Sequence, residues 1–342
     1  MIQIQRILCP TDLSLESDEA LRYAVTLSRA YDAKLTLLHC VEPGSAKSGR
    51  KLTNRRAAAV FEPSLAGHLG LAESRELDWE GLIVENREDV GKTITCEAAE
   101  RGMDLIVIRS RRRPHAALLL GSTAETVCRT APCPVLVTHP GEREWVGLST
   151  GEIDLRRILI AYDFSSDSEL GLNYGISLAQ EHQTELHLLH VLSKPEKEEP
   201  ELLWSTLPDS NYTVAASKLQ RAIPKQTFLW CRVVNSVRWG RAYQEVLAYA
   251  KEHGIDLICM GASGSDFGFG AFFGSNVDRV LRQAPCPVLV ARPLKPADSC
   301  LNRVSAPGFI SSKERSHDNT KILHRSRSVP GNGTHVLQDR AE

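Results

Sequence analysis

Short apolar runs alternate along this chain with longer segments in which apolar residues recur at helical spacing. In the second half, five runs predict strands one to five: residues 157–162, 184–192, 228–235, 256–260 and 287–292. Helical patterns over 167–182, over 241–254 and from Ser275 separate several of these runs, with Ser165 or Ser166 as the N-cap of the first and Gly254 closing the second. Nearly continuous apolar strands joined by helices predict a parallel sheet covered on both faces.

The stretch from 192 to 226 lacks a clear period. Its prolines and its acidic run, "KPEKEEP", predict either a broken helix or a mobile loop.

The same pattern occurs twice. Four pairs of segments match in order: "RILCPTDLS" at 6–14 with "RILIAYDFS" at 157–165, "AKLTLLHCV" at 33–41 with "TELHLLHVL" at 184–192, "RGMDLIVI" at 101–108 with "HGIDLICM" at 253–260, and "APCPVLVTHP" at 131–140 with "APCPVLVARP" at 284–293. The offset stays between 151 and 153 residues. A nearly constant offset of this length indicates a duplicated domain rather than a solenoid.

We therefore predict an α/β protein with two tandem, doubly wound, flavodoxin-like domains of five parallel strands each, over residues 1–140 and 155–294. Residues 141–154 form the linker. From about residue 295 to 342 the chain is polar, mixed in charge and aperiodic, which predicts a disordered tail.

Composition narrows the class of protein. The formal net charge is −1, so no global field favours nucleic acid or an anionic membrane, and we expect neither as a partner. No apolar run reaches the ~18 residues of a membrane span, and the N-terminus lacks the pattern of a signal peptide. The nine cysteines include no CxxC pair, and several lie in apolar runs, which predicts small buried side chains in a reducing cytoplasm.

The glycine-rich loop "GASGSDFGFGAFFGS", from Gly261 to Ser275, is the strongest candidate for chemistry. It follows the fourth predicted strand of the second repeat and leads into a helix. Ligands of parallel α/β sheets bind beyond the carboxyl ends of the strands, where the strand order switches. Glycine lets backbone N–H groups approach a ligand closely, and a helix N-terminus adds partial positive charge. The loop therefore predicts an anion cradle, most simply one for phosphates.

The spacing Gly261-x2-Gly264-x9-Gly274-Ser275 resembles the nucleotide loop of the ATP-binding universal stress proteins. The strand ends "PTDLS" and "AYDFS" and the two "CPVLV" blocks are also similar to that family, and the resemblance covers residues 1–294. It implies HUP-type domains, with the two last strands meeting antiparallel as an intramolecular pseudo-dimer. It also implies a nucleotide-dependent stress-response or signalling role with ATP as the ligand, with Mg²⁺ left open.

The resemblance further implies a role for each matched position. Backbone and side chains at Ala161, Tyr162 and Asp163 would face the adenosine, and the main chain at Val191 would hold the adenine edge. A further set would line the ribose and phosphates: Met260, Gly261, Gly264, Gly274, Ser275 and Asn276.

The first repeat departs from the loop pattern. Arg109 and Arg112 stand where the second repeat has Gly261 and Gly264, although Asp12, Gly121 and Ser122 remain. An arginine side chain would occupy the space of a phosphate. We therefore expect ATP in the second repeat and an empty or weak site in the first.

Several structural alternatives stay open. Ser122 with Glu125, and Ser275 with Asp278, predict capping boxes that coexist with ligand binding. The phenylalanines of the loop, at 267, 269, 272 and 273, would otherwise pack against the other domain or fill the pocket.

No GxxxxGK[ST], HExxH or GxSxG motif occurs, so we expect no dedicated enzyme and at most a weak ATPase, with Asp163 holding a metal. A ligand-free interaction scaffold is the remaining alternative. An unidentified protein partner and a homodimer are both compatible with the sequence.

Overall fold

The computed structural model describes residues 2–42, 52–53, 55–68, 77–86, 89–110, 121–139, 143–147, 152–193, 210–263 and 273–294, and the predicted tail, 295–342, lies outside them. Both repeats belong to one compact unit, Met1–Val304. The first repeat contains β1 (Arg6–Pro10), α1 (Asp18–Ala30), β2 (Lys34–Val41), β3 (Leu52–Thr53), α2 (Arg55–His68), β4 (Trp79–Glu85), α3 (Val90–Glu100), β5 (Leu105–Arg109), α4 (Ser122–Thr130) and β6 (Val135–Thr138).

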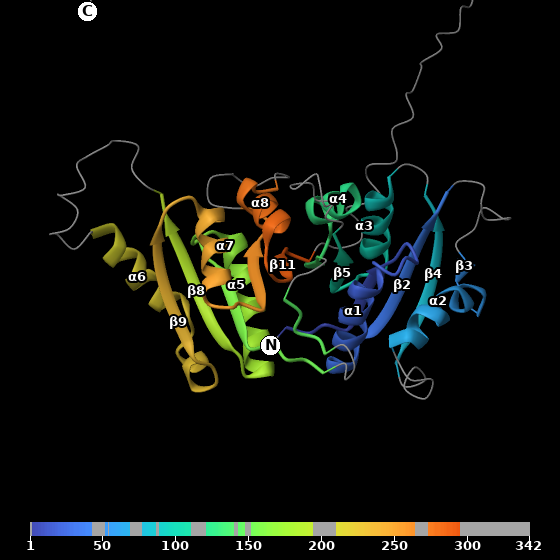
Figure 1. Ribbon diagram of the computed structural model, residues 1–342, viewed down its shortest axis with the longest axis horizontal. Helices are drawn as coiled ribbons and strands as arrows, with labels where there is room; N and C mark the ends of the chain where they lie inside the picture. Colours follow the sequence, from blue (N-terminus) through green and yellow to red (C-terminus); the bar gives the residue numbers. More distant parts are fainter. Residues whose placement is uncertain are drawn as a thin grey trace, which may run out of the picture. The chain divides into compact units, whose positions relative to one another are not determined.

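The second repeat follows the same order (Figure 1). It contains β7 (Arg157–Ala161), α5 (Ser166–His182), β8 (Glu185–Leu192), α6 (Ser210–Ala222), the 3₁₀ turn η3 (Lys225–Leu229), β9 (Val233–Trp239), α7 (Ala242–Glu252), β10 (Leu257–Gly261), α8 (Ser275–Gln283) and β11 (Val288–Ala291).

The eleven strands of the described residues form one sheet in the order β3-β4-β2-β1-β5-β6-β11-β10-β7-β8-β9. Within the second repeat the order is 3-2-1-4-5, so the first and fourth strands lie side by side. The flavodoxin-like order 2-1-3-4-5 is therefore wrong, because it would pair the first strand with the third. The short antiparallel β3 adds a strand at the outer edge of the first repeat. Pairing within each repeat is otherwise parallel.

Two hydrophobic cores cover the two faces of the sheet. One contains Leu21, Phe61, Leu172 and Leu219, from α1, α2, α5 and α6. The other contains residues of α3, α4, α7 and α8, such as Val280 at 0% exposure. The doubly wound α/β fold with two domains is therefore confirmed.

The two last strands join the repeats. β6 and β11 pair antiparallel, with Leu136 opposite Leu289, which confirms the predicted pseudo-dimer. Helices α4 and α8 meet above this junction, where Arg282 Nη2 lies 3.6 Å from Glu125 Oε2. Arg292 Nη1 also donates a 2.9 Å hydrogen bond to the carbonyl of Cys128. Each repeat alone would expose the edge of its last strand, and here the two edges are hydrogen-bonded to each other.

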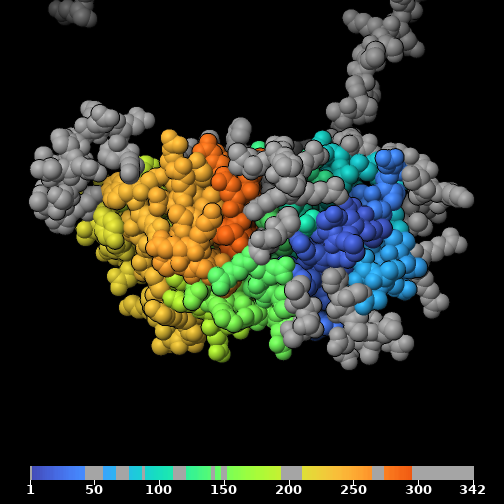
Figure 2. All heavy atoms as spheres, viewed as in Figure 1, coloured from blue at the N-terminus to red at the C-terminus, as the bar shows by residue number. Residues whose placement is uncertain are grey.

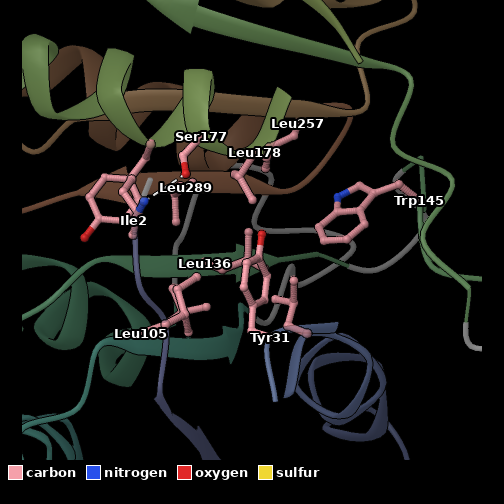
Figure 3. A pocket seen from close by; sticks show the side chains of 12 residues that line it. Ile2, Tyr31, Leu105, Leu136, Trp145, Ser177, Leu178, Leu257 and Leu289 are labelled. Atoms are coloured by element: carbon pink, nitrogen blue, oxygen red, sulfur yellow. Dashed lines mark hydrogen bonds between the residues drawn. The ribbon is translucent and has the colours of Figure 1, made fainter. Parts of the chain in front are cut away.

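An apolar cavity of about 30 Å³ lies on the α1 and α5 side of this junction (Figure 3). Tyr31 and Leu105 enter it from the first repeat, and Leu178 and Leu257 from the second. A volume of that order holds about one water molecule, so the cavity belongs to the packing between repeats rather than to a ligand site.

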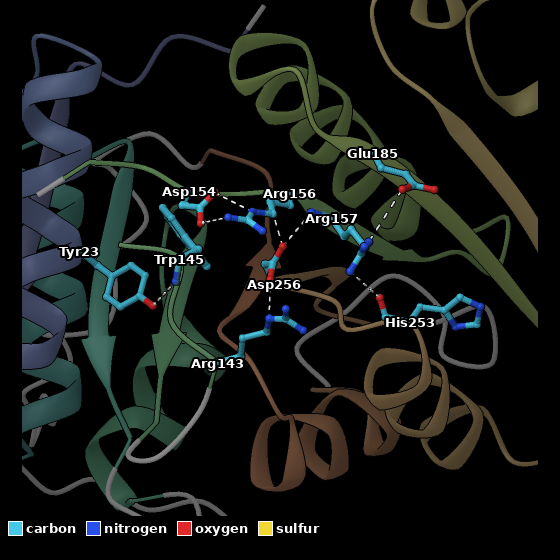
Figure 4. A network of polar contacts seen from close by, with 9 residues as sticks. All are labelled: Tyr23, Arg143, Trp145, Asp154, Arg156, Arg157, Glu185, His253 and Asp256. Carbon is cyan, nitrogen blue, oxygen red and sulfur yellow. Dashed lines mark hydrogen bonds and ion pairs between the residues drawn. The ribbon is translucent and has the colours of Figure 1, made fainter. Parts of the chain in front are cut away.

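The connecting segment is more structured than its sequence indicates. Val146 and Ile153 form a β-bridge, and the Trp145 ring packs edge-on against Tyr23 of α1 with ring centroids 4.8 Å apart. On the other side, Arg143 Nε lies 2.8 Å from Asp256 Oδ1, in the network of Figure 4. The segment therefore clasps both repeats, because its buried Trp145 faces one and its Arg143 the other.

Candidate functional site

The carboxyl ends of β7 and β10 lie side by side in the second repeat, with Met260 paired in register with Ala161. The start of α8 joins this edge because the N–H of Gly274 donates a 3.0 Å hydrogen bond to the carbonyl of Ala262. The structure thus brings together the ends of two central strands and the N-terminus of a helix. Gly264 and the predicted loop phenylalanines at 267, 269 and 272 lie outside the described residues.

Asp163 shapes the turn that follows β7. Its Oδ1 accepts hydrogen bonds from the backbone N–H of Ser165, at 3.0 Å, and from the Ser165 hydroxyl, at 2.5 Å. Ser165 in turn caps α5, since its Oγ accepts from the N–H of Ser168 at 3.1 Å. The predicted N-cap at Ser165 is confirmed, and the half-buried Asp163 is fixed at the edge of the site.

Asp167 is a site residue that the sequence analysis missed. Its Oδ2 accepts a 3.0 Å hydrogen bond from the backbone N–H of Ser263, two residues beyond the end of β10. The first turn of α5 is therefore tied to the start of the glycine loop. An acidic residue in a first helical turn is common, so no signal in the sequence separated this carboxylate from an ordinary one.

The two described glycines of the loop differ in what they permit. A Cβ at Gly261 would lie 2.4 Å from the carbonyl carbon and 2.5 Å from the carbonyl oxygen of Asp167, which are backbone atoms. Gly261 is therefore required by the close packing of α5 on β10. Among the described residues, the atom nearest to a Cβ at Gly274 would be one of the Val277 side chain at 3.5 Å, an ordinary contact. No packing within the described chain explains this second glycine.

The N-terminus of α8 presents its first backbone N–H groups at this edge. Gly274 is the N-cap, and its carbonyl accepts the first helical bond from Asp278 at 3.1 Å. Ser275 and Asn276 are the first two helical residues and are exposed. Their N–H groups have no helical carbonyl to bond, as at every helix start, and so suit an anion.

The predicted capping boxes are wrong. Helices α4 and α8 both take a glycine as N-cap, Gly121 and Gly274, with no side-chain cap. Ser122 and Ser275 each lie one residue inside the helix, where their hydroxyls no longer reach the N3 amide. Each matching acidic residue bonds instead to an arginine four residues on, as Asp278 does to Arg282 at 2.7 Å.

An aromatic group flanks the site at the ends of β7 and β8. Tyr162 is 7% exposed, and its hydroxyl donates to the Glu169 carboxylate. Burial raises the pKa of Tyr162, and the neighbouring Glu169 raises it further. The Phe164 ring lies 5.1 Å from Tyr162 and 4.6 Å from His190, measured between centroids.

The main chain here is fixed from β8. His190 Nδ1 lies 2.8 Å from the Tyr162 carbonyl, so this nitrogen carries the proton and donates it. The adjacent Val191 is half-buried near the end of β8. Most of the predicted site residues lie on the strand ends, in the turn after β7 or at the start of α8: Ala161, Tyr162, Asp163, Met260, Gly261, Gly274, Ser275 and Asn276. Contacts of Val191 with an adenine remain a prediction.

The same position in the first repeat is occupied by an ion pair. Arg109 ends β5 as Gly261 ends β10, and its Nε lies 2.8 Å from Glu19 Oε2. The Arg109 side chain is only 10% exposed. Helix α1 begins at Asp18 without a side-chain cap, three residues later than α5 does at the repeat offset. A side chain at Arg109 forbids the close approach that Gly261 allows. The residues that correspond to the first turn of α5 form a turn with i→i+3 hydrogen bonds instead, such as that from the Ser17 N–H to the Ser14 carbonyl at 3.0 Å. Arg112 lies outside the described residues.

Within the described ranges, no group of three or more His, Cys, Asp or Glu side chains is placed to hold a metal ion. The described parts of the site instead offer backbone N–H groups, a helix N-terminus and fixed carboxylates. Of these groups, the backbone N–H donors at a helix start suit an anion, whereas the carboxylates do not.

Comparisons with known proteins agree with the duplicated architecture. The family model described as the universal stress protein family matches residues 3–139 and 154–292. A universal stress protein of Mycolicibacterium smegmatis is 25% identical over 304 residues, covering 84% of this chain and 97% of its own. A universal stress protein of Thermus aquaticus is 28% identical over 144 residues, covering 40% of this chain and 98% of its own.

Solved structures show the fold. A universal stress protein from Archaeoglobus fulgidus superimposes with a TM-score of 0.57 at 20% identity, covering 85% of this chain and 99% of its own. A protein of unknown function from Pseudomonas aeruginosa gives a TM-score of 0.59 at 20% identity, covering 87% and 95%. In the part of the chain that the structure describes, no helix is long and apolar enough to span a membrane.

Proposed function

Because the chain belongs to the universal stress protein family over both of its repeats, we propose that it is a nucleotide-dependent stress-response or signalling protein whose second repeat binds ATP. The nucleotide would lie beyond the carboxyl ends of β7 and β10, against the N-terminus of α8.

The observation that carries this proposal is the environment of Gly274. The described residues leave room for a Cβ there, the nearest of their atoms being 3.5 Å away, yet the position is glycine at a helix N-terminus. A phosphate that approaches the backbone closely gives such a glycine a purpose. The first N–H groups of α8, at Ser275 and Asn276, would then hold the phosphates, and the turn around Asp163 would face the sugar.

The first repeat supports the proposal by contrast. Its glycine is replaced by Arg109, whose guanidinium already has the carboxylate of Glu19 as its partner. A phosphate entering there would have to displace a half-buried ion pair. We therefore assign one nucleotide site to each chain.

The residues fit ATP as follows. The N–H groups at the start of α8 would hold the phosphates, and the main chain near Val191 would hold the base. Asp163 would be the carboxylate that holds Mg²⁺, while its Oδ1 also accepts the two hydrogen bonds from Ser165. The phosphates of bound ATP would carry the negative charge that the N–H groups of α8 recognise. Slow hydrolysis of ATP at the same site is the second candidate activity.

The direct test is to denature the purified protein and identify the released small molecule by liquid chromatography and mass spectrometry. Release of an adenine nucleotide supports binding, and ADP accumulation over hours from added ATP would identify slow hydrolysis. A protein that releases no nucleotide and binds none in a calorimetric titration would instead be a scaffold, and the proposal would be wrong.

A further inference from the structure

The outer end of the second repeat has an unusual surface. The stretch 210–241, which forms α6, η3 and β9, contains no Asp or Glu and six basic residues: Lys218, Arg221, Lys225, Arg232, Arg238 and Arg241. The corresponding stretch of the first repeat, 56–87, contains six acidic residues and three arginines. The net charge of −1 therefore averages over two ends of opposite character.

This basic stretch also carries exposed apolar side chains. Phe228 is 48% exposed, Leu229 79% and Trp230 45%, and we call these three consecutive residues the apolar tip. Their neighbours Thr227 and Cys231 are buried at 1% and 6%, so the turn is anchored from both sides while the apolar tip faces solvent. Figure 2 shows the yellow and gold atoms of this region at the outer surface of the second repeat.

The fold does not require an apolar tip. The carbonyls of Arg232 and Asp78 accept equivalent hydrogen bonds from Leu186 and Leu35, which aligns the two repeats at this connection. At the same offset, the first repeat has Ser74, Arg75 and Glu76 where the second has the apolar tip. The matching positions of the first repeat are therefore polar in sequence, although they lie outside the described residues, and Phe228, Leu229 and Trp230 are too exposed for packing within the second repeat to account for them.

The apolar tip lies at the amino ends of the strands, next to the first residue of β9. Three exposed basic residues flank it: Arg221 and Lys225 before it and Arg232 after it. Arg232 has a partial partner in Glu185, at 3.5 Å. The candidate nucleotide site occupies the opposite, carboxyl edge of the same sheet, so a partner at the apolar tip leaves that site open.

We propose that the apolar tip and its basic neighbours dock the protein on an anionic lipid surface. Trp and Phe favour the headgroup region of a bilayer, and nearby Lys and Arg are attracted to anionic lipids. The 79% exposed Leu229 favours a lipid surface over a nucleic acid, because an aliphatic side chain can enter the acyl boundary but offers no face on which a base can stack. The net charge of −1 does not report this surface, because the basic residues are concentrated locally around the apolar tip.

The test compares binding to vesicles of pure phosphatidylcholine with binding to vesicles containing about a third phosphatidylglycerol, by co-sedimentation. The intact protein should bind the anionic vesicles at least tenfold more strongly. The triple variant Phe228→Ser, Leu229→Arg, Trp230→Glu copies the first repeat, so it should fold and lose at least tenfold in binding. Arg221→Glu with Lys225→Glu should lose a similar factor.

Matched controls lie elsewhere on the surface. Leu15→Ser removes an 87% exposed leucine of the first repeat, and Lys251→Glu reverses an exposed charge on α7, and both should bind as the unaltered chain does. Circular dichroism melts establish that each variant folds.

Three results would overturn the proposal. One is equal binding of the triple variant and the unaltered chain to anionic vesicles. Another is binding of single-stranded DNA through the same residues without vesicle binding, which would make the surface a nucleic-acid site. The last is a dimer in sedimentation that the triple variant abolishes, which would make it a contact between two copies.

Discussion

Replacing Gly261 by alanine tests the packing on which the candidate site is built. The added Cβ would lie 2.4 Å from the carbonyl carbon of Asp167 and 2.7 Å from the amide nitrogen of Ser168. Both are backbone atoms of the first turn of α5, so they cannot rotate away as a side chain can. The turn must move outward or unwind; in the first repeat, beside Arg109, the equivalent residues form a turn with i→i+3 hydrogen bonds rather than α-helix.

The expected cost follows from what that turn provides. Its hydrogen bond from Ser263 to the Asp167 carboxylate would weaken, at about 1.5–3 kcal/mol for a bond to a charged group. The Ser165 cap would be disturbed, at about 1 kcal/mol. The displacement itself costs about 1–3 kcal/mol. Because these contributions overlap, we expect a loss of about 3 kcal/mol in the free energy of unfolding.

The assay is urea or thermal unfolding of nucleotide-free protein, and a loss of this size lowers the melting temperature by about 6–10 °C. Gly274→Ala is the matched control, because its Cβ would meet no atom of the described residues nearer than 3.5 Å. It should cost no more than the ~1 kcal/mol expected for alanine at an N-cap, while weakening ATP binding about tenfold if phosphate approaches there. Equal melting of the two variants would refute the argument that α5 rests on Gly261.

Further predictions concern the loop, the interface and pH. Gly264→Arg should lower ATP affinity about 100-fold or more without altering the melt, and calorimetry should find one ATP site per chain; two equivalent sites would contradict the asymmetry. Trp145→Ala should cost about 3–5 kcal/mol in unfolding experiments, because its 2% exposed ring packs on Tyr23. Burial lowers the pKa of His187, so as the pH falls the unfolded chain takes up a proton at this residue before the folded chain does. Stability should therefore be full above about pH 6.5 and decline as pH falls below it, less steeply in His187→Gln.

Much of the fold could be predicted from the sequence because the chain states it twice. Strands such as 157–162 and 256–260 are nearly continuously apolar, so they could be predicted from the local sequence without knowing which other segments they contact. The antiparallel junction followed from two matching "PCPVLV" blocks that each needed a partner for an edge. Helix α7 was also predictable, since Gly254 takes a positive φ of 57° just beyond its end.

The errors arose where apolar residues or polar pairs serve unusual purposes. The predicted third strand began at 228, but β9 begins at Val233, since the apolar tip is exposed rather than buried in the sheet. Part of the unclear stretch is the helix α6. The predicted linker packs against both repeats through Trp145 and Arg143, whose partners, Tyr23 and Asp256, are distant in sequence. Asp167 was missed for the same reason: its partner Ser263 lies 96 residues away.

The antiparallel junction of β6 and β11 has a consequence for how this molecule could diversify. In a symmetric dimer of identical chains, every substitution appears at both ends, so a change that fills one ligand site also fills the other. Here the two halves share one chain, and each position mutates alone. Arg109 can pair with Glu19 in one repeat while Gly261 keeps its close packing against α5 in the other, and residues 228–230 can change without a change at residues 74–76. The duplication therefore allows the two halves of a pseudo-two-fold fold to carry different residues at equivalent positions.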